Sequence, residues 1–306
     1  MSALRVLARP RALVLAAAVS AVALAAGCGG SSGNSGDKES MAGMHHTNPS
    51  ARPSDMAGMD GMDDMPGGDG LSATSAGFTM KALTTMLPSG QATTYQFKIM
   101  NMAGKAVTSF ETDQTKLMHF YLIRSDVTGF QHVHPTMAAD GTWSAPIAAT
   151  PPGSYRAYAS FNAKNEKGKA TPVVVSVDAP VAGAEGAEAA FPPPARTTTV
   201  DGYTVTASGD LMAGMSHTLT LTVAKGGTPV TNLEPYLDTY AHLTAFHEGD
   251  LAFAHLHPQG TVNGDHGGPT LTFEAMLPKP GNWRMFVQFQ TAGVLHTAAI
   301  TLAAAG

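Results

Sequence analysis

Histidines occur in this chain in a pattern that repeats at one spacing. In the first copy, His132 and His134 follow His119 after 13 and 15 positions, and the second copy keeps the same intervals. A Phe lies two residues before each H-x-H pair, and a Pro follows it directly. Neutral imidazole is a ligand for copper and zinc. The pattern therefore predicts metal binding by His119, His132, His134, His242, His255 and His257.

Strand geometry explains how these histidines could meet. Side chains at positions i and i+2 of a strand project from the same face, so the members of each H-x-H pair point the same way. Turn residues at 124–129 predict a hairpin in which 117–123 pairs antiparallel with 130–134, and a turn at 247–250 predicts its counterpart. Each hairpin brings the first histidine near the third. We expect two three-histidine sites, with copper as the metal and zinc as the alternative.

Two other interpretations stay open. Duplication of an ancestral domain would copy structural histidines as faithfully as ligands, and Phe130 makes the same strand face partly apolar. The chain would then be a tandem immunoglobulin-like interaction lipoprotein without a metal. A zinc or copper enzyme is the third interpretation, because three histidines and an open position form a catalytic arrangement. No acidic residue adjoins both clusters as a general base, so we expect no enzyme and assign no catalytic residue.

A second group of metal-binding side chains lies in residues 29–71. This stretch is rich in Gly, Ser and Asp and low in apolar bulk, which predicts a disordered tether. Thioethers are soft ligands that favour Cu(I), and a disordered tether has no packing use for methionine. We therefore expect metal capture here, against compositional drift as the alternative. The candidate ligands are Met41, Met44, His45, His46, Met56, Met59, Met62 and Met65.

The N-terminus predicts where the protein is located. Residues 1–28 have Arg5, Arg9 and Arg11 before an apolar run, as signal peptides do. The run ends at Cys28, the chain's one cysteine, which small residues precede and a Gly/Ser stretch follows. This arrangement resembles a bacterial lipobox, in which that cysteine is lipidated. We expect a lipid anchor at Cys28 and a location on the extracytoplasmic face of the cell membrane. The net charge of −5 predicts no nucleic-acid partner.

The rest of the chain contains an internal duplication. "PPGSYRAYASF" near the end of the first unit matches "KPGNWRMFVQF" in the second. Short β-branched and aromatic segments, bounded by turn residues, predict strands throughout. We expect an all-β protein with two tandem immunoglobulin-like or cupredoxin-like β-sandwiches at 72–178 and 198–306. A Pro/Ala-rich linker, 179–197, joins them.

These elements resemble a group of secreted bacterial proteins. "GFQHVHP", "DGTW" and "PGSYRAY", together with the lipobox, are similar to histidine-containing lipoproteins, often actinobacterial, that are described as copper-associated. The small sandwich is also similar to YtkA-like and copper-resistance periplasmic domains. From the histidine pattern, the Met/His-rich tether and the anchor together, we expect copper sequestration, delivery or tolerance, with a copper transporter or another copper protein as partner. The resemblance offers no catalytic residues. Copper–zinc superoxide dismutase shares "HVH", but its disulfide cysteines are missing here.

Overall fold

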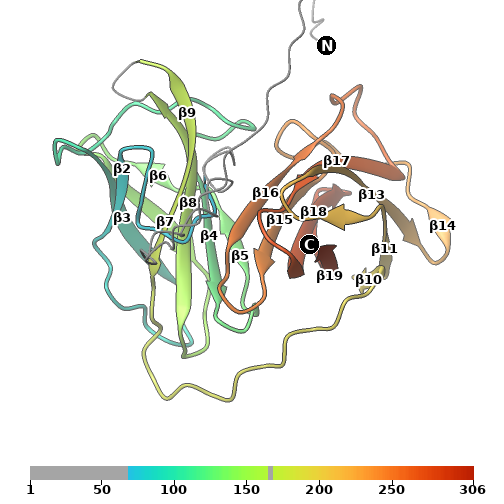
Figure 1. Ribbon diagram of the computed structural model, residues 1–306, viewed down its shortest axis with the longest axis horizontal. Helices are drawn as coiled ribbons and strands as arrows, with labels where there is room; N and C mark the ends of the chain where they lie inside the picture. Colours follow the sequence, from blue (N-terminus) through green and yellow to red (C-terminus); the bar gives the residue numbers. More distant parts are fainter. Residues whose placement is uncertain (1–67, 165–167) are drawn as a thin grey trace, which may run out of the picture. The chain divides into compact units, whose positions relative to one another are not determined.

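The computed structural model describes residues 68–164 and 168–306, which belong to one compact unit. The predicted signal peptide, Cys28 and the methionines and histidines of the tether lie outside the described residues. The described chain is built from strands and turns, with no helix in these two ranges (Figure 1). Among these residues, therefore, no helix has the length and apolar character that a membrane span needs.

Repeat 1 is a sandwich of two antiparallel sheets. One sheet has the order β1-β2-β3-β7-β6, with β1 Thr74–Ser75, β2 Phe78–Ala82, β3 Thr93–Asn101, β7 Thr142–Ile147 and β6 Thr136–Met137. The other has the order β5-β4-β8-β9, with β5 Gln131–Val133, β4 His119–Arg124, β8 Tyr155–Lys164 and β9 Ala170–Asp178. Between them lies an aromatic core in which the rings of Phe97 and Phe120 stack 5.3 Å apart, beside buried Trp143.

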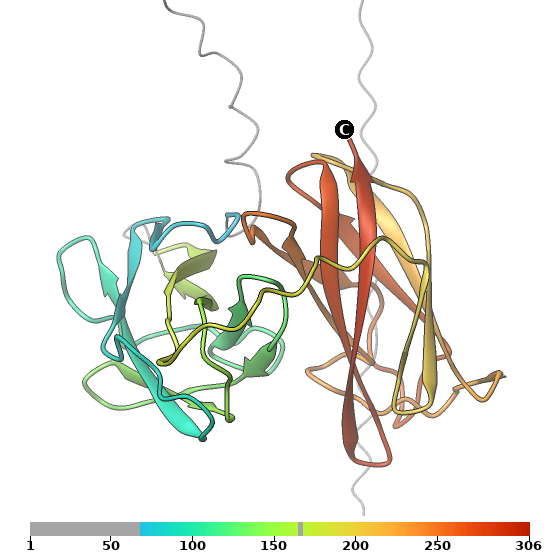
Figure 2. The same ribbon diagram turned by 90° about the horizontal axis from the view of Figure 1, so that it is seen from below.

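Repeat 2 has one continuous path of strands. Its order is β10-β11-β13-β17-β16-β15-β18-β19-β12, and β14 pairs with β13. The bounds are β10 Thr197–Val200, β11 Tyr203–Ser208, β12 Leu211–Met212, β13 Ser216–Lys225, β14 Thr228–Pro229, β15 His242–His247, β16 Phe253–Pro258, β17 Thr270–Met276, β18 Gly281–Thr291 and β19 Val294–Ala305. Strand β16 pairs with both β15 and β17, so it joins the two halves of the sandwich. The β18–β19 hairpin appears as the long red pair in Figure 2.

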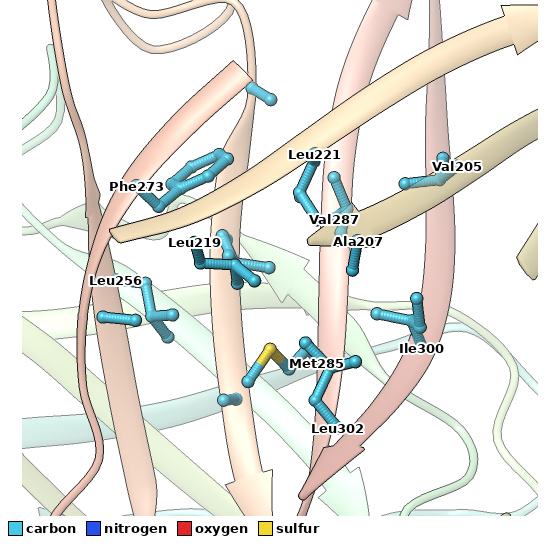
Figure 3. Packing of buried hydrophobic residues seen from close by; sticks show 14 of the residues in the cluster. Val205, Ala207, Leu219, Leu221, Leu256, Phe273, Met285, Val287, Ile300 and Leu302 are labelled. Carbon is cyan, nitrogen blue, oxygen red and sulfur yellow. The ribbon is translucent and has the colours of Figure 1, made fainter. Parts of the chain in front are cut away.

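The interior of repeat 2 follows from alternation along its strands. In β13, Leu219, Leu221 and Val223 point inward, while the threonines between them are more exposed. All three belong to one core with Phe273 and Met285 from other strands, and Figure 3 shows Leu219 and Leu221 in it. Inward side chains at every second position are what a half-buried strand produces. The predicted all-β fold with a duplicated domain is confirmed.

The predicted hairpin of repeat 1 is also confirmed. Strands β4 and β5 pair antiparallel, with Phe120 opposite Val133 and Tyr121 opposite His132. Its counterpart pairs β15 with β16 and sets Thr244 opposite His255. Figure 1 shows both hairpins. These two hairpins carry all the histidines that the repeated pattern singled out.

Strand β4 departs from simple alternation, because all six of its residues are buried. Phe120 and Leu122 point into the core of repeat 1. Tyr121 and Ile123, on the other face, belong to a third apolar cluster, which also contains Phe246 and Phe253 of repeat 2. We call this third cluster the seam. It contains Tyr121, Ile123, Val127, Tyr158 and Val174 from repeat 1 and Phe246, Leu251, Phe253 and Phe286 from repeat 2, with Phe130, Phe191 and Ala299 packed against it.

Candidate metal centre

The β4–β5 hairpin gathers the first histidine set. His119 begins β4, His132 lies in β5, and His134 follows directly after the last residue of that strand. One ring nitrogen from each of the three lies within 4.8 Å of the others. Nitrogens bound at 2.0–2.1 Å to one ion are roughly 3.3 to 4.2 Å apart, from tetrahedral to linear arrangements. A small rotation of one ring would therefore bring all three to a single ion.

The second set is arranged differently. The ring centroids of His242 and His255 are 4.8 Å apart, and those of His255 and His257 are 5.1 Å apart. In the described ranges, however, only the first set forms a group of converging ligand atoms. His242 instead stacks over the first set, with its centroid 4.7 Å from His132 and its ring 2° from the plane of His119. The two sets therefore form one histidine cluster across the seam rather than two separate triads.

Hydrogen bonds determine which nitrogens of the first set carry a proton. Nε2 of His119 lies 3.1 Å from the carbonyl oxygen of Asp113. A carbonyl can only accept, so this nitrogen is the donor. Nδ1 of His132 lies 2.6 Å from Oε1 of Gln288, whose amide nitrogen faces Thr297, and it donates in the same way. In the neutral rings, the free lone pairs are therefore on Nδ1 of His119 and Nε2 of His132.

These two lone pairs face each other. Nδ1 of His119 and Nε2 of His132 are 3.1 Å apart, close to the separation of two nitrogens on one tetrahedral ion. With both protons committed elsewhere, neither atom can donate to the other. Two acceptors at this distance repel each other, and a cation bound to both removes the repulsion. The pair is therefore arranged as a ligand pair and not as an ordinary hydrogen bond.

Two further histidine nitrogens in the cluster are unsatisfied within the described part of the chain. Nε2 of His134 and Nε2 of His255 are buried, and neither has a hydrogen-bond partner in residues 68–164 and 168–306. A buried polar atom without a partner costs about 1–3 kcal/mol. Coordination of a metal would satisfy both. Each repeat thus contributes one unsatisfied imidazole to the cluster.

The cluster keeps its imidazoles neutral. Burial lowers the pKa of His119, and burial together with the neighbouring histidines holds the pKa of His132 and His255 well below its ordinary value. For His134, burial followed by repulsion from His119 lowers the pKa to about 3. Neutral imidazole is the form that binds a metal. At neutral pH the cluster is therefore ready to coordinate a metal without first losing protons.

His242 has a different role, because both of its nitrogens are occupied. Its Nδ1 donates to Oε1 of Gln114 at 2.7 Å. Its Nε2 then accepts from the hydroxyl of Tyr121 at 3.1 Å. Both partners belong to repeat 1. His242 therefore links repeat 2 to the site by hydrogen bonds. Its lone pair accepts the hydrogen bond from Tyr121 and is not free for a metal.

His257 and His255 line a cavity beside the cluster. Its volume is about 330 Å³, and Asp113, Ser160 and Asn162 line it from repeat 1. His257 is exposed and lies opposite Glu274 on the neighbouring strand. The cavity thus connects solvent with His255, the unsatisfied imidazole of repeat 2.

Sequence reasoning missed the residues that orient the histidines. Tyr121 had a detectable signal, since it lies two positions after His119 on the same face of a predicted strand. Gln114, Gln288 and the carbonyl of Asp113 had none, because their contacts depend on how the turn and the two repeats pack. The predicted ligands Met41, Met44, His45, His46, Met56, Met59, Met62 and Met65, like Cys28, lie outside the described residues.

Solved structures resemble this chain only distantly. The Escherichia coli adhesin FdeC is 15% identical over 76% of this chain and 65% of its own, with a TM-score of 0.23. InvD of Yersinia pseudotuberculosis is 15% identical over 76% and 58%, with a TM-score of 0.23. The adhesin InvE of the same species is 13% identical over 77% and 61%, also with a TM-score of 0.23. This chain thus spans less than two thirds of their lengths, and scores this low support no inference about function.

The family comparison is more specific. No curated protein matches the sequence. A family model described as "Domain of unknown function (DUF8832)" matches it twice, over residues 73–179 and 198–306. Each match contains one copy of the histidine pattern. The chain therefore belongs to the DUF8832 family and carries its domain twice.

Proposed function

We propose that this protein binds a transition-metal ion through the histidine cluster at the seam, with copper as the preferred ion. The observation that carries the proposal is the pair of lone pairs on His119 and His132, which face each other at 3.1 Å with both ring protons committed elsewhere. His134 supplies the third ring nitrogen, and its buried Nε2 has no hydrogen-bond partner among the described residues. A bound ion satisfies all three atoms at once.

The choice of copper rests on the whole donor set. Imidazole binds copper and zinc alike. The methionines of the tether add thioethers, which select Cu(I) over zinc. With a lipid anchor at Cys28, such a protein would hold copper at the extracytoplasmic face of the membrane. Its role would be sequestration, delivery to a copper transporter or another copper protein, or tolerance, with zinc as the alternative ion.

A second candidate function is that of an interaction protein whose histidines are structural. The complete hydrogen bonding of His242 favours it, as does the position of the cluster inside an apolar seam. Under this alternative, the rings only pack and hydrogen-bond between the repeats. The two candidates make opposite predictions for His134, because a structural role has no use for a buried nitrogen without a partner.

The decisive experiment measures metal content in a protein whose tether has lost its candidate metal ligands, which we call the tether-silenced protein. In this background Met41, Met44, Met56, Met59, Met62 and Met65 are replaced by Leu and His45 and His46 by Gln, while all described residues stay unchanged. We expect about one Cu(I), Cu(II) or Zn(II) equivalent by elemental analysis and competition titration, since three imidazoles hold one ion. His134→Phe should sharply lower the bound metal, and His266→Ala, at an exposed histidine outside the repeated pattern, should not.

The same variant separates the two candidates through stability. His134→Phe keeps a planar ring and removes a buried nitrogen that has no partner. Without metal, the free energy of unfolding of this variant should therefore equal that of the parent or exceed it by up to about 1 kcal/mol. Loss of metal with stability retained supports the metal site. Full metal content in His134→Phe, or no metal in the parent, would leave the interaction protein as the better account.

The tether has its own test. In the full-length mature protein, replacing only the six methionines by Leu should lower Cu(I) uptake and leave the thermal unfolding midpoint unchanged. The Zn(II) content should stay the same, since zinc does not favour thioethers. An unchanged Cu(I) stoichiometry would remove the tether from the copper role.

A further inference from the structure

We propose that one ion is shared by the two repeats, with His255 of repeat 2 completing the shell that repeat 1 begins, and that the bound ion thereby fastens the repeats together. The inference rests on the proposed function and adds to it a structural consequence. It assigns His255 to the same ion as His119, His132 and His134, instead of to a separate site in its own repeat.

The position of His255 is the first support. Its ring centroid lies 6.0 Å from that of His119 and 4.8 Å from that of His242. Its Nε2 is buried and has no hydrogen-bond partner within the ranges that the structure describes. The three nitrogens within 4.8 Å of one another do not include this one. Rotation of the side chain, which borders the cavity of about 330 Å³, brings it to the ion as the fourth ligand.

Hydrogen bonds exchanged between the repeats are the second support. Gln288 of repeat 2 accepts a hydrogen bond from Nδ1 of His132 and so leaves Nε2 of that ring free for the ion. In the other direction, Tyr121 and Gln114 of repeat 1 orient His242 of repeat 2. Each repeat therefore positions a histidine of the other. The ligand set is complete only when the repeats are docked.

Thermodynamic linkage gives the consequence. If docking improves metal affinity by some factor, the metal improves docking by the same factor. The apolar seam already holds the repeats in contact, with the rings of Phe130 and Phe286 stacked at 4.0 Å. The ion adds a polar fastening beside this apolar one. Metal binding therefore strengthens the association of repeat 1 with repeat 2.

The test cuts the peptide chain between the two repeats while both stay folded. A protease site is inserted between Ala187 and Glu188, an exposed part of the linker, in the tether-silenced background. The purified, folded protein is then cut. The dissociation constant of the two fragments is measured with Zn(II) or Cu(I) present and with a chelator. We expect the metal to lower this constant by about tenfold or more, within the range of linked sites.

Variants tell the two proposals apart. His255→Phe should keep metal on repeat 1, more weakly, and metal should tighten the association of its fragments less than in the parent, because only the contact of Gln288 with His132 still couples docking to the ion. His134→Phe should weaken both metal binding and the response of fragment association to metal, and His266→Ala should change neither. Circular dichroism of each variant confirms folding, and His255→Gln repeats the test with a polar side chain. A metal-bound parent whose fragments associate equally well with chelator would overturn the shared ion and leave the proposed function standing. A parent that binds no metal would overturn the proposed function itself.

Discussion

At the scale of single residues, the site depends on which imidazole nitrogen carries the proton. His119 and His132 are ordinary neutral histidines, and only their outer partners make them a ligand pair. The carbonyl of Asp113 accepts a hydrogen bond from Nε2 of His119, and Oε1 of Gln288 accepts one from Nδ1 of His132. The lone pairs are then forced toward each other. Outer partners of this kind are part of a metal site as much as the ligands are.

Gln288 is therefore expected to act as a positioning residue. Gln288→Leu leaves Nδ1 of His132 without an acceptor and frees the ring to adopt the other tautomer. Metal affinity should fall by about 10- to 100-fold, as when other outer partners are removed. Gln288→Glu keeps the acceptor and should restore most of the affinity. Competition titration of both variants checks this, and equal affinities for Leu and Glu would contradict it.

The pKa shifts predict how acid acts on the metal-free protein. Burial holds the pKa of His134 at about 3 and lowers that of His119, His132 and His255 in the folded state. Unfolded histidine titrates near 6.5, so below about pH 6.5 the unfolded chain binds more protons. The free energy of unfolding should be highest above that value and fall as the pH drops toward 3. Urea melts between pH 7.5 and 4 measure it.

Metal shifts that acid response. A bound ion blocks the nitrogens that acid must protonate, so the folded protein should resist acid further when metal is present. Because the folded pKa values are low, metal should stay bound somewhat below the pH of about 6.5 at which free imidazole is half protonated. Release at or above pH 6.5, or identical acid curves with and without metal, would count against ligation by these histidines.

At the scale of elements, strand β4 supports both the fold and the site. Its burial pattern has no polar face, because one side meets the core of repeat 1 and the other the seam. β15, which pairs with β16 in repeat 2, has five of six residues buried in the same way. Strands buried on both faces are typical of sheets covered on two sides. The two repeats cover each other along these strands.

The hairpin was predictable, and what it faces was not. Alternation placed His132 and His134 on one face, and the turn at 124–129 set the register with Tyr121 opposite His132. These are local signals. The contact of Tyr121 with His242 joins residues 121 positions apart. A duplicated motif looks the same whether its copies form two sites or one, so the spacing alone could not distinguish them.

The buried hydroxyl of Tyr121 has a measurable role in β4. Tyr121→Phe keeps the ring and removes the donor to His242, whose Nε2 then has no partner. The metal-free protein should lose about 1–3 kcal/mol of stability. Metal affinity should be unchanged or higher, because the variant frees a lone pair beside the cluster. A chemical denaturation curve and a metal titration on the same sample check both, and a large loss of affinity would show that Tyr121 positions a ligand.

At the scale of the whole molecule, the two domains form a functional pair. Duplication usually yields two copies of one site, yet here the copies have diverged. Tyr121 and Gln114 correspond by position within the histidine pattern to Thr244 and Leu237. The hydroxyl of Thr244 is buried, with no hydrogen-bond partner in the described part of the chain. Repeat 1 therefore holds the oriented triad, while repeat 2 supplies Gln288, His242 and His255. Neither repeat contains the whole arrangement.

This division predicts that a mutation in the seam weakens metal binding without touching a ligand. Phe286 of repeat 2 stacks on Phe130 of repeat 1 and is almost fully buried. Phe286→Ala removes that contact, at a cost of about 3–5 kcal/mol for a buried Phe. The repeats then dock less tightly, and linkage requires a weaker metal affinity as well. Titration of the tether-silenced protein should show the affinity falling about fivefold or more, at the lower end of measured couplings.

Leu221→Ala provides the matched control for that experiment. Leu221 is fully buried in the core of repeat 2, where its loss costs about 2–5 kcal/mol. It belongs to the interior of one repeat and not to the seam (Figure 3). This variant should lose comparable stability and keep its metal affinity, because it does not change docking directly. If both variants lost metal affinity in proportion to their loss of stability, the lower affinity would follow from overall destabilisation and not from weaker docking of the repeats. If only Phe286→Ala loses affinity, the metal centre depends on the two repeats being held together.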